Sequence, residues 1–97
     1  MRVVLHPDVY SDIDAIMEYY ERVATPELSD DFYAELRGFI LKAAKKPEHF
    51  PIRERDLRRV NLRRFPYHFL FRADGDIMRV LIVRHDRRHP SFGMDRR

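Results

Sequence analysis

The chain has 97 residues, enough for one domain, and its hydrophobic content of 44% permits one packed core. It has no cysteine, which excludes disulfides and thiol chemistry and fits a reducing compartment. Its net charge is +3, no stretch approaches the roughly 18 apolar residues of a membrane span, and the apolar run at the start is too short for a signal peptide. We expect a single cytoplasmic domain over residues 1–97, with no membrane partner.

A short apolar strand over residues 2–5 is predicted to lead into two helices. The first begins at Pro7 and runs to about Val23, because its apolar residues recur at steps of three and four. The second begins after Thr25, whose hydroxyl suits a helix cap, and ends before Pro47. Only about two residues separate the helices, so they should fold back as an antiparallel hairpin.

Three segments, of which the last two are rich in aromatic and β-branched residues, follow a proline-bracketed link over residues 47–52 and a charged lead-in over residues 53–56. They cover residues 58–62, 67–72 and 77–83. The turn residue Gly75 lies between the last two, which predicts a β-hairpin, and the three together predict an antiparallel meander. The fold class is therefore α+β: a strand, a two-helix hairpin, and a three-stranded meander with the helices on one sheet face. We expect the other face to be open to solvent.

The charge is distributed unevenly along the chain. Residues 1–50 carry six Lys and Arg against ten Asp and Glu, whereas residues 51–97 carry thirteen against six, and all thirteen are arginine. The planar guanidinium fork suits phosphate and carboxylate, so an exposed arginine rim at the strand ends is a candidate target-binding surface, with a solvated surface as the plain alternative. The candidates are Arg58, Arg59, Arg63, Arg64, Arg84, Arg87, Arg88 and Phe92. Phe92 could stack on a base, but we favour a role as a staple that holds the tail on the sheet.

No catalytic motif of the common enzyme classes is present, and no metal or cofactor site is expected. The five histidines are scattered over separate elements without ligand spacing. Histidine beside guanidinium groups is suited to metal-independent RNA cleavage, in which a base, an acid and an arginine act on the phosphate. The residues for that reaction are His85, His68, Arg59, Arg64 and Arg88. The alternative is that His85 ends its strand with the ring against the core or a backbone group, and no catalytic set is convincing.

Several short patterns follow one another in a fixed order along nearly the whole chain. They are Tyr19-Tyr20, Pro47-x-x-Phe50-Pro51, Arg58-Arg59-x-x-Leu62-x-x-Phe65-Pro66-Tyr67, and Val80-Leu81-Ile82-Val83-x-His85-x-Arg87-Arg88-x-Pro90. In this order and within this length, the chain resembles the ParE/RelE superfamily, the toxins of type II toxin–antitoxin systems.

The resemblance implies two possible activities. ParE-like members inhibit growth by binding DNA gyrase, whereas RelE-like members are ribosome-dependent endoribonucleases that cut mRNA. The ribonucleases carry a basic residue on the middle strand and a tyrosine or histidine near the end of the chain. Those places fall here on Tyr67 or His68 and on Phe92, so the resemblance favours the ParE-like branch. It also implies a small acidic antitoxin of the ParD/RelB kind as partner, with gyrase, or alternatively the ribosome and its mRNA, as target.

Overall fold

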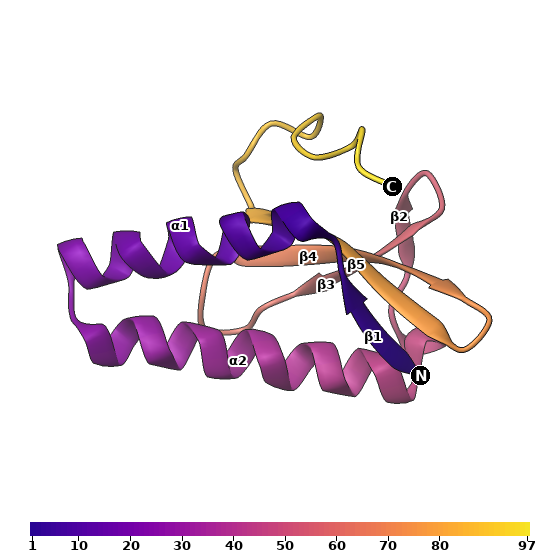
Figure 1. Cartoon of the computed structure of the whole chain (residues 1–97), viewed down its shortest axis with the longest axis horizontal. Helices are drawn as coiled ribbons and strands as arrows, with labels where there is room; N and C mark the ends of the chain where they lie inside the picture. Colours follow the sequence, from indigo (N-terminus) through magenta and orange to yellow (C-terminus); the bar gives the residue numbers. More distant parts are fainter.

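A five-stranded mixed sheet carries two antiparallel helices against one face (Figure 1). The computed structural model describes residues 1–97. The elements in chain order are β1 (Arg2–Leu5), α1 (Pro7–Val23), α2 (Pro26–Lys45), a 3₁₀ turn (Pro47–His49), β2 (Ile52–Glu54), β3 (Leu57–Asn61), β4 (Tyr67–Asp74) and β5 (Ile77–His85). The predicted α+β class, helical hairpin and antiparallel β3–β4–β5 meander are confirmed.

The helix boundaries follow from local signals. The Oγ1 of Thr25 accepts a hydrogen bond from the Leu28 amide at 3.0 Å, and Pro26 occupies the first position of α2. At the start of α1, His6 Nδ1 accepts from the Asp8 amide at 3.0 Å. These side chains satisfy amides that have no partner within the first turn, which sets where each helix begins. Neither helix has the length and apolar character that crossing a lipid bilayer requires.

The sheet has two strands beyond the predicted meander, in the order β1-β5-β4-β3-β2. Strand β1 pairs in parallel with β5, with Val3 opposite Met78. Strand β2 spans the end of the proline-bracketed link and the start of the charged lead-in, so the expectation that residues 52–54 form no strand was wrong. Its turn into β3 places Arg55 at a φ of 54°. Arginine gives no turn signal comparable to Gly or Asn, so the short β2–β3 hairpin is not visible in the sequence pattern.

A bulge in β5 interrupts the alternation of its side chains between the two core layers, so that two consecutive residues face the same layer. Leu70 lies opposite Ile82 and Phe71 opposite Val80, so Leu81 is the extra residue. Val80 and Val83 therefore join the layer beneath the helices, while Leu81 and Ile82 join the layer on the opposite face. The helix-side layer includes Val9, Ile13, Ile16, Phe32, Leu36, Ile40, Val60, Phe69, Phe71 and Met78.

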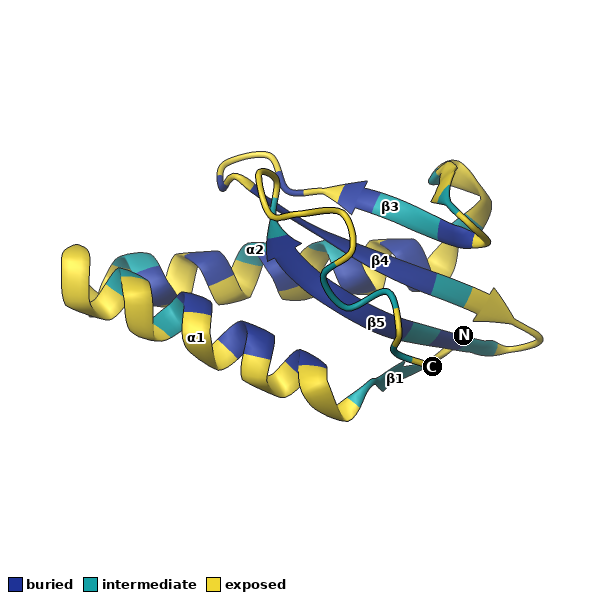
Figure 2. Cartoon of the chain, turned by 90° about the horizontal axis from the view of Figure 1, so that it is seen from above, coloured by how far each residue is buried: buried dark blue, intermediate teal, exposed yellow.

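The face away from the helices is covered by the last residues of the chain. Residues 86–97, which we call the strap, cross this face, and Figure 2 shows them passing over β4 and β5. Phe92 and Met94 pack on four buried side chains of the sheet: Leu57, Leu70, Leu81 and Ile82. The expected open face is thus closed, and Phe92 acts as the staple that we favoured.

Candidate functional site

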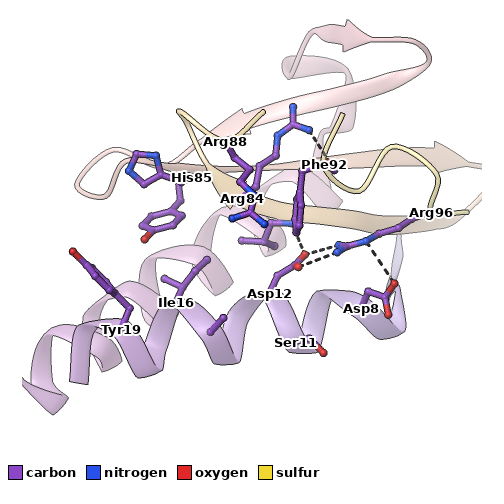
Figure 3. A pocket seen from close by; sticks show the side chains of 13 residues that line it. Asp8, Ser11, Asp12, Ile16, Tyr19, Arg84, His85, Arg88, Phe92 and Arg96 are labelled. Carbon is purple, nitrogen blue, oxygen red and sulfur yellow. Dashed lines mark hydrogen bonds and ion pairs between the residues drawn. The ribbon is translucent and has the colours of Figure 1, made fainter. Parts of the chain in front are cut away.

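A groove of about 450 Å³ runs between α1, the end of β5 and the strap (Figure 3). Helix α1 supplies one wall, the strap supplies the other, and Tyr67, Val83 and His85 line it from β4 and β5. The α1 residues are Asp8, Ser11, Asp12, Ala15, Ile16 and Tyr19, and the strap residues are Arg88, Phe92 and Arg96. Arg84 completes the lining. The groove therefore combines apolar and charged side chains.

The predicted candidates Arg84, His85, Arg88 and Phe92 all line this groove. They meet because β5 ends at His85 and the strap then turns back across the sheet. Arg87 and Arg63 are exposed, and neither side chain makes a hydrogen bond or ion pair. Arg63 borders a separate hollow beside α2, together with Glu35 and Lys42.

Arg84 is buried, with 4% of its surface exposed. Its Nε donates to His68 Nε2 at 3.0 Å, and its NH2 donates to both Glu54 carboxylate oxygens at 2.9 and 2.6 Å. Its NH1 donates to the carbonyls of Pro90 and Phe92, each at 3.0 Å. These five bonds match the five N–H groups of a guanidinium. The expectation that Arg84 lies on an exposed rim was wrong, because its hydrogen-bond partners are all internal.

His68 is also buried, at 1% exposure. Its Nδ1 lies 2.8 Å from Asp86 Oδ1, while Nε2 accepts from Arg84. Burial lowers the pKa of His68 below its usual 6.5, since water no longer stabilises the imidazolium, and the hydrogen bond to Asp86 opposes this only in part. Both ring nitrogens have internal partners, so the expectation of an accessible acid or base at His68 was wrong.

The remaining predicted arginines do not gather on one rim. Arg58 NH1 donates to the carbonyl of Phe50 at 2.7 Å. Arg64 pairs with Asp31 of α2 at 3.1 Å. Their partners lie on different elements, so the guanidinium groups point in different directions. The single arginine rim expected from the sequence is therefore corrected to a groove with separate arginines around it.

Arg59 belongs to a polar chain across the strap-covered face. Its Nε donates to Asn61 Oδ1 at 2.8 Å and its NH2 lies 3.7 Å from Asp86 Oδ1. Asp86 in turn contacts His68, which accepts from Arg84. Arg59 is thus held by neighbours on the sheet and does not line the groove.

Two guanidinium groups lie over the ring of Phe92. The Cζ of Arg88 is 4.2 Å from the ring centroid and that of Arg96 is 5.1 Å away. Arg88 is exposed and makes no side-chain hydrogen bond, so its N–H groups stay available while its guanidinium packs on the Phe92 ring. Arg88 is therefore a preorganised donor at the groove, suited to a carboxylate or phosphate oxygen.

Arg96 and Asp12 form a contact that sequence reasoning missed. Arg96 donates to both carboxylate oxygens of Asp12, and NH2 to Oδ1 measures 3.0 Å. Asp12 also accepts from the Val83 amide at 3.1 Å, and the Asp12 hydrogen bonds raise the pKa of Arg96. The available signal was Asp12 itself, which stands next to Ile13 on the apolar face of α1. An acidic residue at such a position needs a buried partner.

His85 ends β5 with its ring against the core, as in the alternative considered from the sequence. The ring centroids of His85 and Tyr67 are 5.1 Å apart, and His85 Nδ1 accepts from the Arg87 amide at 3.0 Å. Burial raises the pKa of Tyr67 to about 12, so this phenol is neutral at physiological pH. No group of three or more His, Cys, Asp or Glu side chains is placed to hold a metal ion.

Comparison with known proteins places the chain in a family. The family model for the ParE toxin of the type II toxin–antitoxin system parDE matches residues 3–90. Among curated protein sequences, none matches the chain significantly. A solved structure described as a chromosomal ParDE toxin–antitoxin system from P. aeruginosa superposes with a TM-score of 0.78 at 19% identity, covering 88% of this chain and 95% of that one. That likeness supports the fold, and the family match over most of the chain shows that it belongs to the ParE toxins of type II toxin–antitoxin systems.

Proposed function

We propose that this ParE family member inhibits growth by binding DNA gyrase, without breaking a bond itself, and that the groove between α1 and the strap is the binding surface. The observation that carries the proposal is that two of the candidate ribonuclease residues have internal partners. His68 is buried between Arg84 and Asp86, and Arg64 is paired with Asp31 on α2. His68 and Arg64 are therefore not available beside His85 and Arg88 in the groove, and a second titratable acid or base is missing from the candidate set there, which favours binding over cleavage.

The groove has the features of a protein-binding surface. Apolar and aromatic side chains, Ile16, Tyr67 and Phe92 among them, line it together with the exposed ring of Tyr19. Aromatic and arginine side chains are the residue types that contribute most to protein interfaces. Arg88, fixed on Phe92, adds a free donor for an acidic group of the partner.

The experiment is a supercoiling assay with purified gyrase and the full chain. Inhibition of supercoiling, or trapped cleaved DNA, at micromolar protein is the expected result. Unaffected supercoiling with no trapped cleavage complex contradicts the proposal. Heat-denatured protein serves as the control for effects of added polypeptide.

Neutralisation by an antitoxin is the second part of the proposal. The partner is a small acidic protein, since opposite charge speeds association with the arginine-rich half of the chain and a wide contact makes it tight. Co-expression with the product of the neighbouring small reading frame is expected to restore growth of a host that produces the toxin. A host that grows equally well without the neighbour contradicts an active toxin.

One arrangement favours the alternative, a ribosome-dependent endoribonuclease. His85 and Arg88 line the same groove, and His85 Nε2 has no hydrogen-bond partner. A histidine and an unpaired guanidinium in one groove supply two of the three groups that cleavage at a phosphate uses. If this alternative holds, purified protein added to translating ribosomes should cut the mRNA. Intact mRNA would rule the alternative out.

A further inference from the structure

The strap forms one wall of the groove. Arg88, Phe92 and Arg96 line it from residues 86–97, opposite the side chains of α1 (Figure 3). The position of the strap therefore decides how wide the groove is and where the Arg88 guanidinium stands. Whatever holds the strap also shapes the binding surface.

Arg84 holds the strap from beneath. Its NH1 group donates to the carbonyls of Pro90 and Phe92, on both sides of Ser91. Its other three donors are fixed by Glu54 of β2 and His68 of β4. The guanidinium thus ties the strap to two strands of the sheet, and none of its N–H groups is left for a ligand.

Two further features press the strap against the sheet. Gly93 has a φ of 78°, and a Cβ at this position would lie 2.8 Å from Cγ1 of Ile82. Arg96 donates to the Leu81 carbonyl at 3.0 Å and pairs with Asp12 of α1. The strap therefore approaches the sheet closely at Gly93 and is joined both to β5 and to α1.

We infer that Arg84 is a positioning residue: it holds the strap so that Arg88 and Phe92 face α1 across the groove, and the groove has its binding shape only while this guanidinium is in place. Lysine cannot replace it. An ammonium has three donors on a flexible stem and no planar fork, so it cannot bridge Glu54, His68 and two carbonyls at once. The functional part of this inference rests on the proposed role of the groove in binding gyrase.

The chain has no tryptophan, so one introduced tryptophan can report how exposed the strap is. Phe92→Trp places a single fluorophore on the strap, and acrylamide quenching then reports its exposure. We expect Arg84→Lys in this background to raise the quenching constant about twofold or more, because at least one carbonyl bond to the strap is lost. Val60→Ala, a cavity in the helix-side core with no strap contact, is the matched control and should leave quenching unchanged. Equal quenching of the Arg84→Lys and parent proteins overturns the inference.

Hydrogen exchange on the unmodified chain gives a second measurement that needs no variant. The amides of Phe92, Met94 and Arg96 donate within the strap to His89, Ser91 and Gly93. Slow exchange at these amides is expected if the strap is held. Exchange at the rate of an unstructured peptide overturns the inference, even if Arg84→Lys fails to fold.

Gyrase inhibition is measured with variants that keep Phe92. Arg84→Lys should raise the concentration for half-inhibition of gyrase about tenfold, the effect of losing one or two hydrogen bonds, while Val60→Ala inhibits like the parent. Equal potency of Arg84→Lys and Val60→Ala contradicts the positioning role. If the parent itself leaves gyrase unaffected, the gyrase proposal fails, whereas exchange still decides whether the strap is held and quenching whether Arg84 holds it.

Discussion

Arg84 Nε donates a hydrogen bond to His68 Nε2 at 3.0 Å, and this contact fixes the tautomer of the histidine. Guanidinium nitrogen is always a donor, so Nε2 must present its lone pair and the ring proton must be on Nδ1. Nδ1 then donates to Asp86 Oδ1, 2.8 Å away. A neutral His68 thus connects the end of β5 to the first residue of the strap.

Because His68 is buried in its neutral form, the stability of the fold depends on pH. The folded-state pKa of His68 lies below its unfolded value near 6.5, because burial disfavours the imidazolium. Below pH 6.5 the unfolded chain binds the proton more readily than the folded one, so stability is full above pH 6.5 and falls as pH drops towards the folded-state pKa. The loss is at most about 1.4 kcal/mol per pH unit for this one group.

Urea unfolding at pH 7.5, 6.0 and 5.0 measures this dependence. The control is His68→Gln, whose amide can accept from Arg84 and donate to Asp86 without titrating. The expected result is a smaller loss of stability on acidification in the variant than in the parent. Parallel curves for the two proteins would show that His68 is not the group responsible.

Gly93 and Gly75 provide a matched pair of positive-φ glycines. Both have left-handed backbones, at 78° and 61°, but a Cβ at Gly75 meets nothing within 4 Å whereas one at Gly93 collides with Ile82. Gly75→Ala should lower the free energy of unfolding by about 1 kcal/mol from backbone strain alone. Gly93→Ala should lower it by about 1–3 kcal/mol more, since the strap must shift from its apolar contacts. Thermal unfolding compares the two, and equal losses would contradict the close approach of the strap.

The Asp12 carboxylate should contribute more to the stability of the fold than a carboxylate on the surface does. Asp12→Ala removes the partner of the Arg96 guanidinium and of the Val83 amide, so we expect a loss of about 3 kcal/mol or more, as when one member of a buried pair is deleted. Asp14→Ala, on the exposed side of the same helix, should change stability by less than about 0.5 kcal/mol. Denaturant unfolding of the two variants checks the difference, and similar small effects would mean that the strap is not clasped at α1.

The sequence was informative where structure is decided locally. Thr25 and Pro26 located the start of α2, and Gly75 located the β4–β5 turn, because caps and turns depend on a few neighbouring residues. The position of β1 beside β5 could not be predicted, since a parallel pairing leaves no short-range signal.

The site was predictable only in part, for the same reason. His85, Arg88 and Phe92 could be selected by residue type and all line the groove. Arg84 looks like any other arginine of the second half until its partner Glu54, 30 residues away, is placed beside it. An exposed binding arginine and a buried structural one are told apart only by tertiary contacts.

The proposed inhibition requires that the groove beside Arg88 is the surface that binds gyrase. The direct measurement is supercoiling inhibition by Arg88→Glu against Arg37→Glu, an equal charge change on the exposed side of α2 away from the groove. We predict that Arg88→Glu weakens inhibition at least about tenfold, as for a residue at the centre of an interface, while Arg37→Glu inhibits like the parent. Equal inhibition by both variants would contradict binding through this groove.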